Sequence, residues 1–221
     1  MIYTSSYKEL EGIKLRTYSI SWDRGKDADY YGECYPNLAP KKTFWNTWKN
    51  NIGKIPEEEN NRYYIEEYWK EVLSKLDVEK VYKDLDYSTL LCYENNTEFC
   101  HRHIVAAWFE LLLGVEVPEI SIENYIIKKV EKPNYIKEYL EDAMKKNLNM
   151  HGFTSLRAFH LFEKAEKYEK EADELEEKTG KCYDHYRQQA AFLRSDADMA
   201  EDEYRIKHKT RTRKKQIDKV E

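Results

Sequence analysis

The stretch that decides the fold runs from Ser88 to Gly114 and reads STLLCYENNTEFCHRHIVAAWFELLLG. It opens with a compact β-prone run to Tyr93, continues through a polar connection and ends in an apolar run that Gly114 stops. Strand, loop and helix in this order form the unit from which open parallel sheets are built. Such sheets hold ligands beyond the carboxyl ends of their strands, so we expect a site where this strand meets this helix.

Further strands and helices are predicted on both sides of this unit. Ile2 to Thr4 is β-prone, and Ile13 to Ser21 alternates in the manner of a strand. Asn60 to Leu76 places its large apolar residues at helical spacing, and Val115 to Ile120 is one more extended run. We therefore predict a Rossmann-like α/β domain over residues 1–149, with an open, mainly parallel sheet and flanking helices.

The rest of the chain, residues 150–221, has a different character. Phe153 to Lys178 and Cys182 to Lys209 are two highly charged helical stretches separated by Thr179 and Gly180. This pattern predicts a helical hairpin with coiled-coil packing and a basic end, Arg205 to Lys215. Its apolar stripe is narrow and rich in alanine, so we expect it to need the domain, a second copy or a protein partner to stay folded.

Composition narrows the class of protein. The net charge of −5 disfavours a sequence-specific nucleic-acid binder. Four scattered cysteines and no apolar leader favour a reducing cytoplasm over a disulfide framework. The longest apolar stretch, Ile104 to Val115, is shorter than the roughly 20 residues that cross a bilayer, so we expect no membrane span.

The segment Leu90 to Ala107 resembles the Cys-His-Arg signature of the bacterial and phage family catalogued as domain of unknown function 488. Three other segments resemble one branch of that family: Ile2 to Ser6, Leu38 to Pro40 and Tyr64 to Leu76. The resemblance covers about residues 1–118 and implies a Rossmann-like domain, with little about its chemistry. Asn95 departs from the pattern, since many members carry lysine or arginine there.

The same signature suggests a reactive thiol. Thr97 is a predicted N-cap, which would place Cys100 in the first helical turn, where unpaired backbone N–H groups and the helix dipole favour negative charge. Arg102 and a neighbouring histidine would also favour a thiolate. The cluster could be a nucleophile with a base, or a pocket for a phosphate or carboxylate. Alternatively, Cys100 is a small buried residue at a tight junction.

Candidate site residues follow from these positions. The predicted catalytic residues are Cys100, His101 and Arg102, and the predicted ligand-binding residues are Glu94, His103, Ser5, Arg24 and Tyr31. Glu94 is the expected partner of Arg102 or a ligand-orienting acid. The residue types of Cys92, Cys100, His101 and His103 suit zinc, but their spacing matches no common zinc pattern, so no metal is predicted. The sequence leaves the cofactor open, and the chain has neither a glycine-rich phosphate loop nor a nucleophile elbow.

Two functions of different classes remain open. The leading hypothesis is an enzyme or binding protein for a small anionic, nucleotide-like ligand held at the helix start, with Cys100 as nucleophile. The alternative is an adaptor in which the hairpin and its basic end bind a protein or nucleic acid. Whether the protein is an enzyme stays open at this level.

Overall fold

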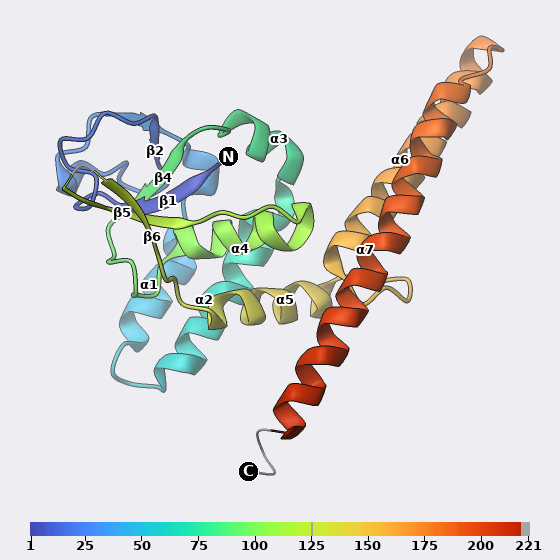
Figure 1. Cartoon of the computed structure of the whole chain (residues 1–221). Helices are drawn as coiled ribbons and strands as arrows, with labels where there is room; N and C mark the ends of the chain where they lie inside the picture. Colours follow the sequence, from blue (N-terminus) through green and yellow to red (C-terminus); the bar gives the residue numbers. More distant parts are fainter. Residues whose placement is uncertain (125, 218–221) are drawn as a thin grey trace. The chain divides into compact units, whose positions relative to one another are not determined.

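The computed structural model of the 221-residue chain describes residues 1–124 and 126–217, with side chains as far as residue 209 (Figure 1). The chain divides into two compact units, Met1–Asn147 and Leu148–Glu221. The first holds the sheet and its helices, and the second is a helical hairpin. All four cysteines are free thiols.

A six-stranded sheet forms the centre of the first unit, in the order β3-β2-β4-β1-β5-β6. Strand β4 (Thr89–Cys92) lies between β1 and β2, parallel to both, and all four of its residues are buried. The other strands are β1 (Tyr3–Ser6), β2 (Thr17–Ser19), β3 (Glu33–Cys34), β5 (Glu119–Glu123) and β6 (Ile126–Val130), and only the β5–β6 pair is antiparallel among the described pairings. The predicted α/β class with a mainly parallel sheet is confirmed.

Helix α4 (His101–Leu113) packs against the sheet and is surrounded by other helices. It contacts β1 and β4 on one side and α3 and α5 on others, and ten of its side chains are buried (Figure 1). A helix that is apolar nearly all round is stable only when covered in this way. The remaining helices of this unit are α1 (Lys42–Asn51), α2 (Glu57–Glu71), α3 (Val78–Asp84) and α5 (Tyr135–Asn147).

Tyr30, in the loop that follows β2, packs against the core beside the sheet. The Tyr30 hydroxyl donates to the Thr17 carbonyl at 2.9 Å, and its ring lies 5.3 Å from that of Tyr7. Gly25 has a φ of 76°, and a Cβ there would come within 2.9 Å of Tyr7. The turn therefore requires glycine both for its backbone and for its close approach to the ring.

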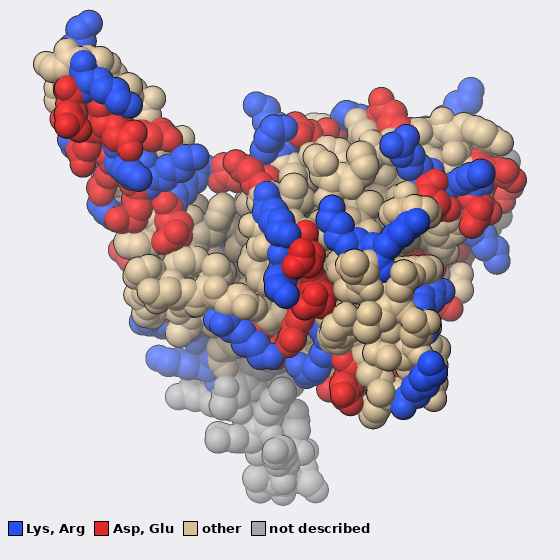
Figure 2. Space-filling model, turned by 180° about the vertical axis from the view of Figure 1, so that it is seen from behind, with Lys and Arg blue, Asp and Glu red and all other residues tan. Residues whose placement is uncertain are grey.

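The second unit is the predicted hairpin, made of α6 (Leu156–Thr179) and α7 (Asp184–Ile217). Ser155 caps α6 by accepting a hydrogen bond from the Ala158 N–H, and Gly180 ends it with a φ of 65°. The Glu201 carboxylate of α7 also accepts from the Ser155 N–H at 2.8 Å, which ties the second helix to the start of the first. Both signs of charge are interspersed along this hairpin in Figure 2.

No helix in the described part of the chain combines the length and the apolar composition that crossing a membrane requires.

Candidate functional site

The site is built where β4 ends and α4 begins. Cys92 is the last residue of β4, and Cys100 is the N-cap of α4, with the extended backbone angles φ −149° and ψ 145°. The predicted helix start at Thr97 is wrong. Instead, the Glu98 N–H donates to the Asn95 carbonyl at 3.1 Å and the Asn95 N–H donates to the Glu98 carboxylate at 2.9 Å, which closes a turn before the helix. Cys100 therefore stands at the helix terminus itself, beside unpaired N–H groups.

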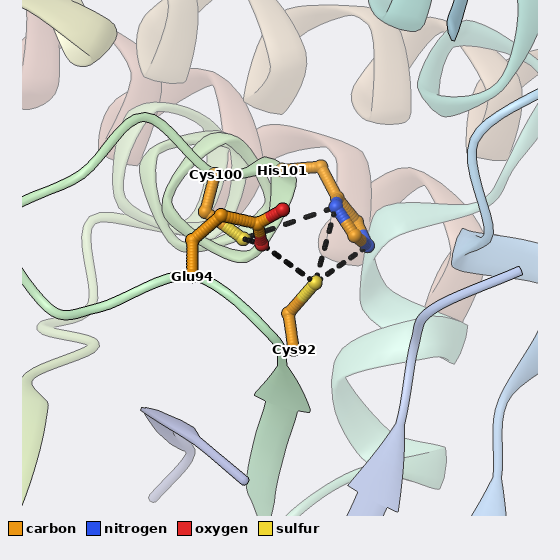
Figure 3. A group of neighbouring side chains, drawn as sticks. All are labelled: Cys92, Glu94, Cys100 and His101. Atoms are coloured by element: carbon orange, nitrogen blue, oxygen red, sulfur yellow. Dashed lines mark hydrogen bonds between the residues drawn. The ribbon is translucent and has the colours of Figure 1, made fainter. Parts of the chain in front are cut away.

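Four side chains converge at this junction, and we call them the thiol cluster: Cys92, Glu94, Cys100 and His101 (Figure 3). Glu94 Oε2 lies within hydrogen-bonding distance of both sulfurs, 3.1 Å from Cys92 Sγ and 2.9 Å from Cys100 Sγ. His101 Nδ1 lies 3.5 Å from the Cys92 sulfur and 3.9 Å from the Cys100 sulfur. Both cysteines and the histidine are buried, whereas Glu94 is half-buried and is the member that solvent reaches.

A backbone contact fixes the imidazole of His101. Its Nε2 lies 3.0 Å from the Ile20 carbonyl oxygen. A carbonyl oxygen only accepts, so Nε2 carries the proton of this hydrogen bond. Nδ1 is consequently directed toward the two sulfurs, where it can accept a proton or coordinate an ion.

Electrostatics separate the two thiols. Burial raises the pKa of Cys92 well above its ordinary value. Burial alone would also raise the pKa of Cys100, but a hydrogen bond with Cys92 and the charges of Arg102 and His101 lower it well below its ordinary value. Burial and the neighbouring Cys100 charge raise the pKa of Glu94 to about 7. The cluster thus combines an anionic sulfur with a carboxyl group that can carry a proton.

Arg102 belongs to a second, fully buried group. Its Nε and Nη2 donate to Glu119 Oε1 at 3.1 and 3.0 Å, and Nη2 also donates to the Asn95 carbonyl at 3.0 Å. His103 Nε2 lies 3.2 Å from Glu119 Oε2. The expected pairing of Arg102 with Glu94 is therefore wrong, because Glu119 of β5 takes that role. Arg102 Nη1 is buried and has no hydrogen-bond partner among the described residues.

Sequence reasoning missed Glu119, although one signal was present. At strand alternation Glu119 falls on the same side as Val115 and Val117 in the predicted strand Val115 to Ile120, whereas Glu116 falls on the other, and a buried carboxylate requires a cation. Strand β5 pairs with β1, and α4 packs on β1, so Glu119 meets the Arg102 guanidinium of α4.

Three further predicted ligand-binding residues, Ser5, Arg24 and Tyr31, are not members of the thiol cluster. Ser5 is buried, and its hydroxyl donates to the Ile120 carbonyl at 2.7 Å. Arg24 is exposed with a φ of 62°, and Tyr31 is 92% exposed. Within the described structure, none of the three has a hydrogen bond or ion pair with the cluster.

The thiol cluster also has the composition of a metal site. One donor atom from each of its four residues lies within 4.8 Å of the others. The fourth member of this set is Glu94 and not His103, the residue grouped with Cys92, Cys100 and His101 in the sequence analysis. His103 contacts Glu119 instead.

The protein is thus an α/β protein with a buried thiol site. Its central parallel strand ends in Cys92, and the next helix begins at Cys100. Residues 3–112 match the family model DUF488-N3a, which is described as the active DUF488-N3 subclade. The chain belongs to the DUF488 family, as the signature resemblance implied. No curated protein and no solved structure matches the chain. Glu119 and the hairpin lie beyond the matched residues.

Proposed function

We propose that this protein is an enzyme that acts on a small anionic, nucleotide-like ligand, with Cys100 as its nucleophile. The observation that carries the proposal is the Cys100 sulfur at the N-terminus of α4, 2.9 Å from a half-buried carboxyl group. A thiol held between a helix N-terminus and a proton carrier is the arrangement that nucleophilic catalysis requires. The matching model's description as an active subclade agrees with an enzyme.

The side chains divide the chemistry among them. The Cys100 sulfur contributes the electron pair that forms a bond to an electrophilic atom of the substrate. The leaving group departs with the pair of the broken bond and takes a proton from Glu94. Water then displaces the sulfur, restores the thiolate and returns its proton to Glu94. His101, held by the Ile20 carbonyl, keeps a positive or polar edge beside the sulfur throughout.

The preference for an anionic ligand follows from the charges that surround the sulfur. Unpaired N–H groups at the start of α4 and the helix dipole attract negative charge. Arg102 has committed Nε and Nη2 to Glu119 and Asn95, which leaves buried Nη1 as a donor for a ligand oxygen. The site lies at the carboxyl end of the central parallel strand, where open α/β sheets bind nucleotides.

A thermal-shift screen tests this proposal. The purified protein is heated with nucleotides, nucleosides, sugar phosphates and simple anions. A true ligand at 100 times its Kd stabilises by about 2.7 kcal/mol, or roughly 5–10 °C for a chain of this size. We expect the shift to fall by at least half in Cys100→Ala and in Arg102→Lys, each compared with its own ligand-free melting temperature.

The matched controls are Cys182→Ala and Arg62→Lys, which change an exposed thiol and a half-exposed arginine away from the site. They should keep the full shift. A ligand that stabilises all four variants equally would contradict a site at the start of α4.

A second candidate function, self-association through the hairpin, is favoured by one observation. Phe192, Met199 and Ile206 recur every seven residues on α7 and are 69%, 56% and 67% exposed. A seven-residue apolar repeat is the pattern of a coiled-coil seam. Acidic residues lie at 196 and 198, and lysines lie at 207 and 209, so an antiparallel second copy would place opposite charges together. Side chains of the basic run beyond residue 209 lie outside the described residues.

Light scattering coupled to size exclusion tests this candidate. We expect a dimer at micromolar concentration that becomes a monomer when Phe192, Met199 and Ile206 are all replaced by serine. Gln189→Ser, on the same helix, is the control and should leave the dimer intact. A wild-type monomer at 100 µM would exclude the candidate.

A further inference from the structure

The thiol cluster directs four metal-binding atoms toward one point. The atoms are two sulfurs, one imidazole nitrogen and one carboxylate oxygen, all within 4.8 Å of one another (Figure 3). Zinc–sulfur bonds of about 2.3 Å and zinc–nitrogen or zinc–oxygen bonds of about 2.1 Å place tetrahedral ligand atoms roughly 3.4–3.8 Å apart. The sulfurs lie 2.9–3.1 Å from the Glu94 oxygen and 3.5–3.9 Å from the His101 nitrogen, and no pair of the four atoms is more than 4.8 Å apart. Movements below about 1 Å would therefore complete the shell.

A contact outside the thiol cluster supports His101 as a metal ligand. Its Nε2–H donates to the Ile20 carbonyl at 3.0 Å, which leaves Nδ1 as the coordinating atom. Histidines that bind metals nearly always donate their other ring N–H to a carbonyl or carboxylate, because this bond fixes the tautomer and the ring orientation. The contact comes from the residue that follows β2, outside the cluster, and is present before any ion binds.

The donor set selects the kind of ion. Two thiolates and an imidazole prefer thiophilic ions such as Zn²⁺, whereas Mg²⁺ and Ca²⁺ need shells of oxygen atoms. Two thiolates and one carboxylate carry one negative charge more than Zn²⁺ neutralises, and the Arg102 guanidinium, although paired with Glu119, acts to lower the pKa of both thiols and so favours their anionic form.

We propose that the reduced cluster binds one Zn²⁺ ion through Cys92, Glu94, Cys100 and His101, and that the bound ion blocks Cys100 as a nucleophile. Binding breaks the Cys92 S–H bond and releases the proton that Glu94 carries, both protons pass to water, and no electron is transferred. A proton on His101 Nδ1 leaves in the same way. The metal site stands by itself, whereas the blocking of Cys100 rests on the proposed function.

Metal binding is measured on the full reduced chain with two ions. Equilibrium dialysis against Zn²⁺ should give one ion per chain. Co²⁺ in its place should give the intense visible bands of a tetrahedral ion and a sulfur-to-cobalt charge-transfer band. Replacing a residue that only hydrogen-bonds to a metal ligand weakens metal binding by roughly 10–100-fold, and the loss of a direct ligand should weaken Zn²⁺ binding by more. We therefore expect losses above about 100-fold for Cys92→Ser, Cys100→Ser and His101→Ala.

Cys34→Ser and Cys182→Ser serve as matched controls, because these thiols lie outside the cluster and should leave the affinity unchanged. Circular dichroism of each variant shows whether it is folded. Unchanged Zn²⁺ affinity in the folded cluster variants, or cobalt spectra without the charge-transfer band, would overturn the metal site.

Iodoacetamide labelling of Cys100 separates this inference from the proposed function. Labelling that stops with one equivalent of Zn²⁺ and returns with a chelator supports both. Fast labelling that added Zn²⁺ does not slow, with no ion bound in dialysis, overturns the metal site and leaves the nucleophile standing. Cobalt bands from a chain whose metal-free Cys100 never labels would support the site but overturn its blocking role and the proposed nucleophile together.

Discussion

Replacing Glu119 with alanine is expected to lower the free energy of unfolding by about 3–5 kcal/mol. The Glu119 carboxylate and the Arg102 guanidinium are both fully buried, with the closest atoms 3.0 Å apart. Removing the acid leaves a buried cation with only the Asn95 carbonyl to accept from it. The desolvation of that cation is no longer offset, and this uncompensated charge is the source of the large effect.

The control is Glu123→Ala, at the other end of the same strand, where the carboxylate is 62% exposed and pairs with Lys128. An exposed pair contributes about 0–1 kcal/mol. All five tryptophans lie between residues 22 and 108, so their fluorescence during urea unfolding reports on the first unit alone. Equal losses for the two variants would mean that the buried pair adds nothing. Replacing Arg102 and Glu119 together with methionine and leucine should recover much of the stability.

Cys100 is expected to react with iodoacetamide at pH 7 about 10 to 100 times faster than Cys92. Both thiols are 2% exposed, so access is matched and the comparison isolates their charge state. The pKa of Cys100 is lowered by Cys92, Arg102 and His101 against the effect of burial, whereas burial raises that of Cys92. The thiolate is the reactive form, so the difference in pKa becomes a difference in rate.

Mass spectrometry of the cysteine peptides over time gives the rate at each thiol. The same reaction in urea is the control, because unfolding removes both environments and should bring the two rates together. Equal rates in the folded protein would argue that Cys100 is only a small residue at a tight junction, and would remove the nucleophile from the proposed function.

The central strand and helix were predictable because their signals are local. Ser88 to Tyr93 is β-prone, Gly114 ends the helix with a φ of 68°, and both follow from neighbouring residues. The start of α4 was not predictable in this way. The turn between Asn95 and Glu98 competes with the helix, and the two hydrogen bonds of the turn are the ones that form. Thr97 is a good capping residue in isolation, yet the chain caps at Cys100.

The partners within the site were harder to predict, since they depend on which strands become neighbours. Glu119 meets Arg102 only because β5 lies beside β1, a fact that no spacing in the sequence reveals. Glu94 was identified as a site acid, but its contact with both cysteines required the actual path of the connection. The parallel arrangement of β1, β2 and β4 was anticipated, whereas the direction of the Ser5 hydroxyl toward Ile120 was not.

The hydrogen bond from His101 to residue 20 has an evolutionary consequence. The acceptor is a main-chain carbonyl, which every amino acid possesses, and the N–H of the same residue is anchored to the Leu91 carbonyl at 3.2 Å. Any replacement at this position that preserves the strand will therefore also preserve the imidazole orientation. The identity of residue 20 is therefore constrained by its fully buried place in the core and not by the histidine, whose acceptor does not depend on that side chain.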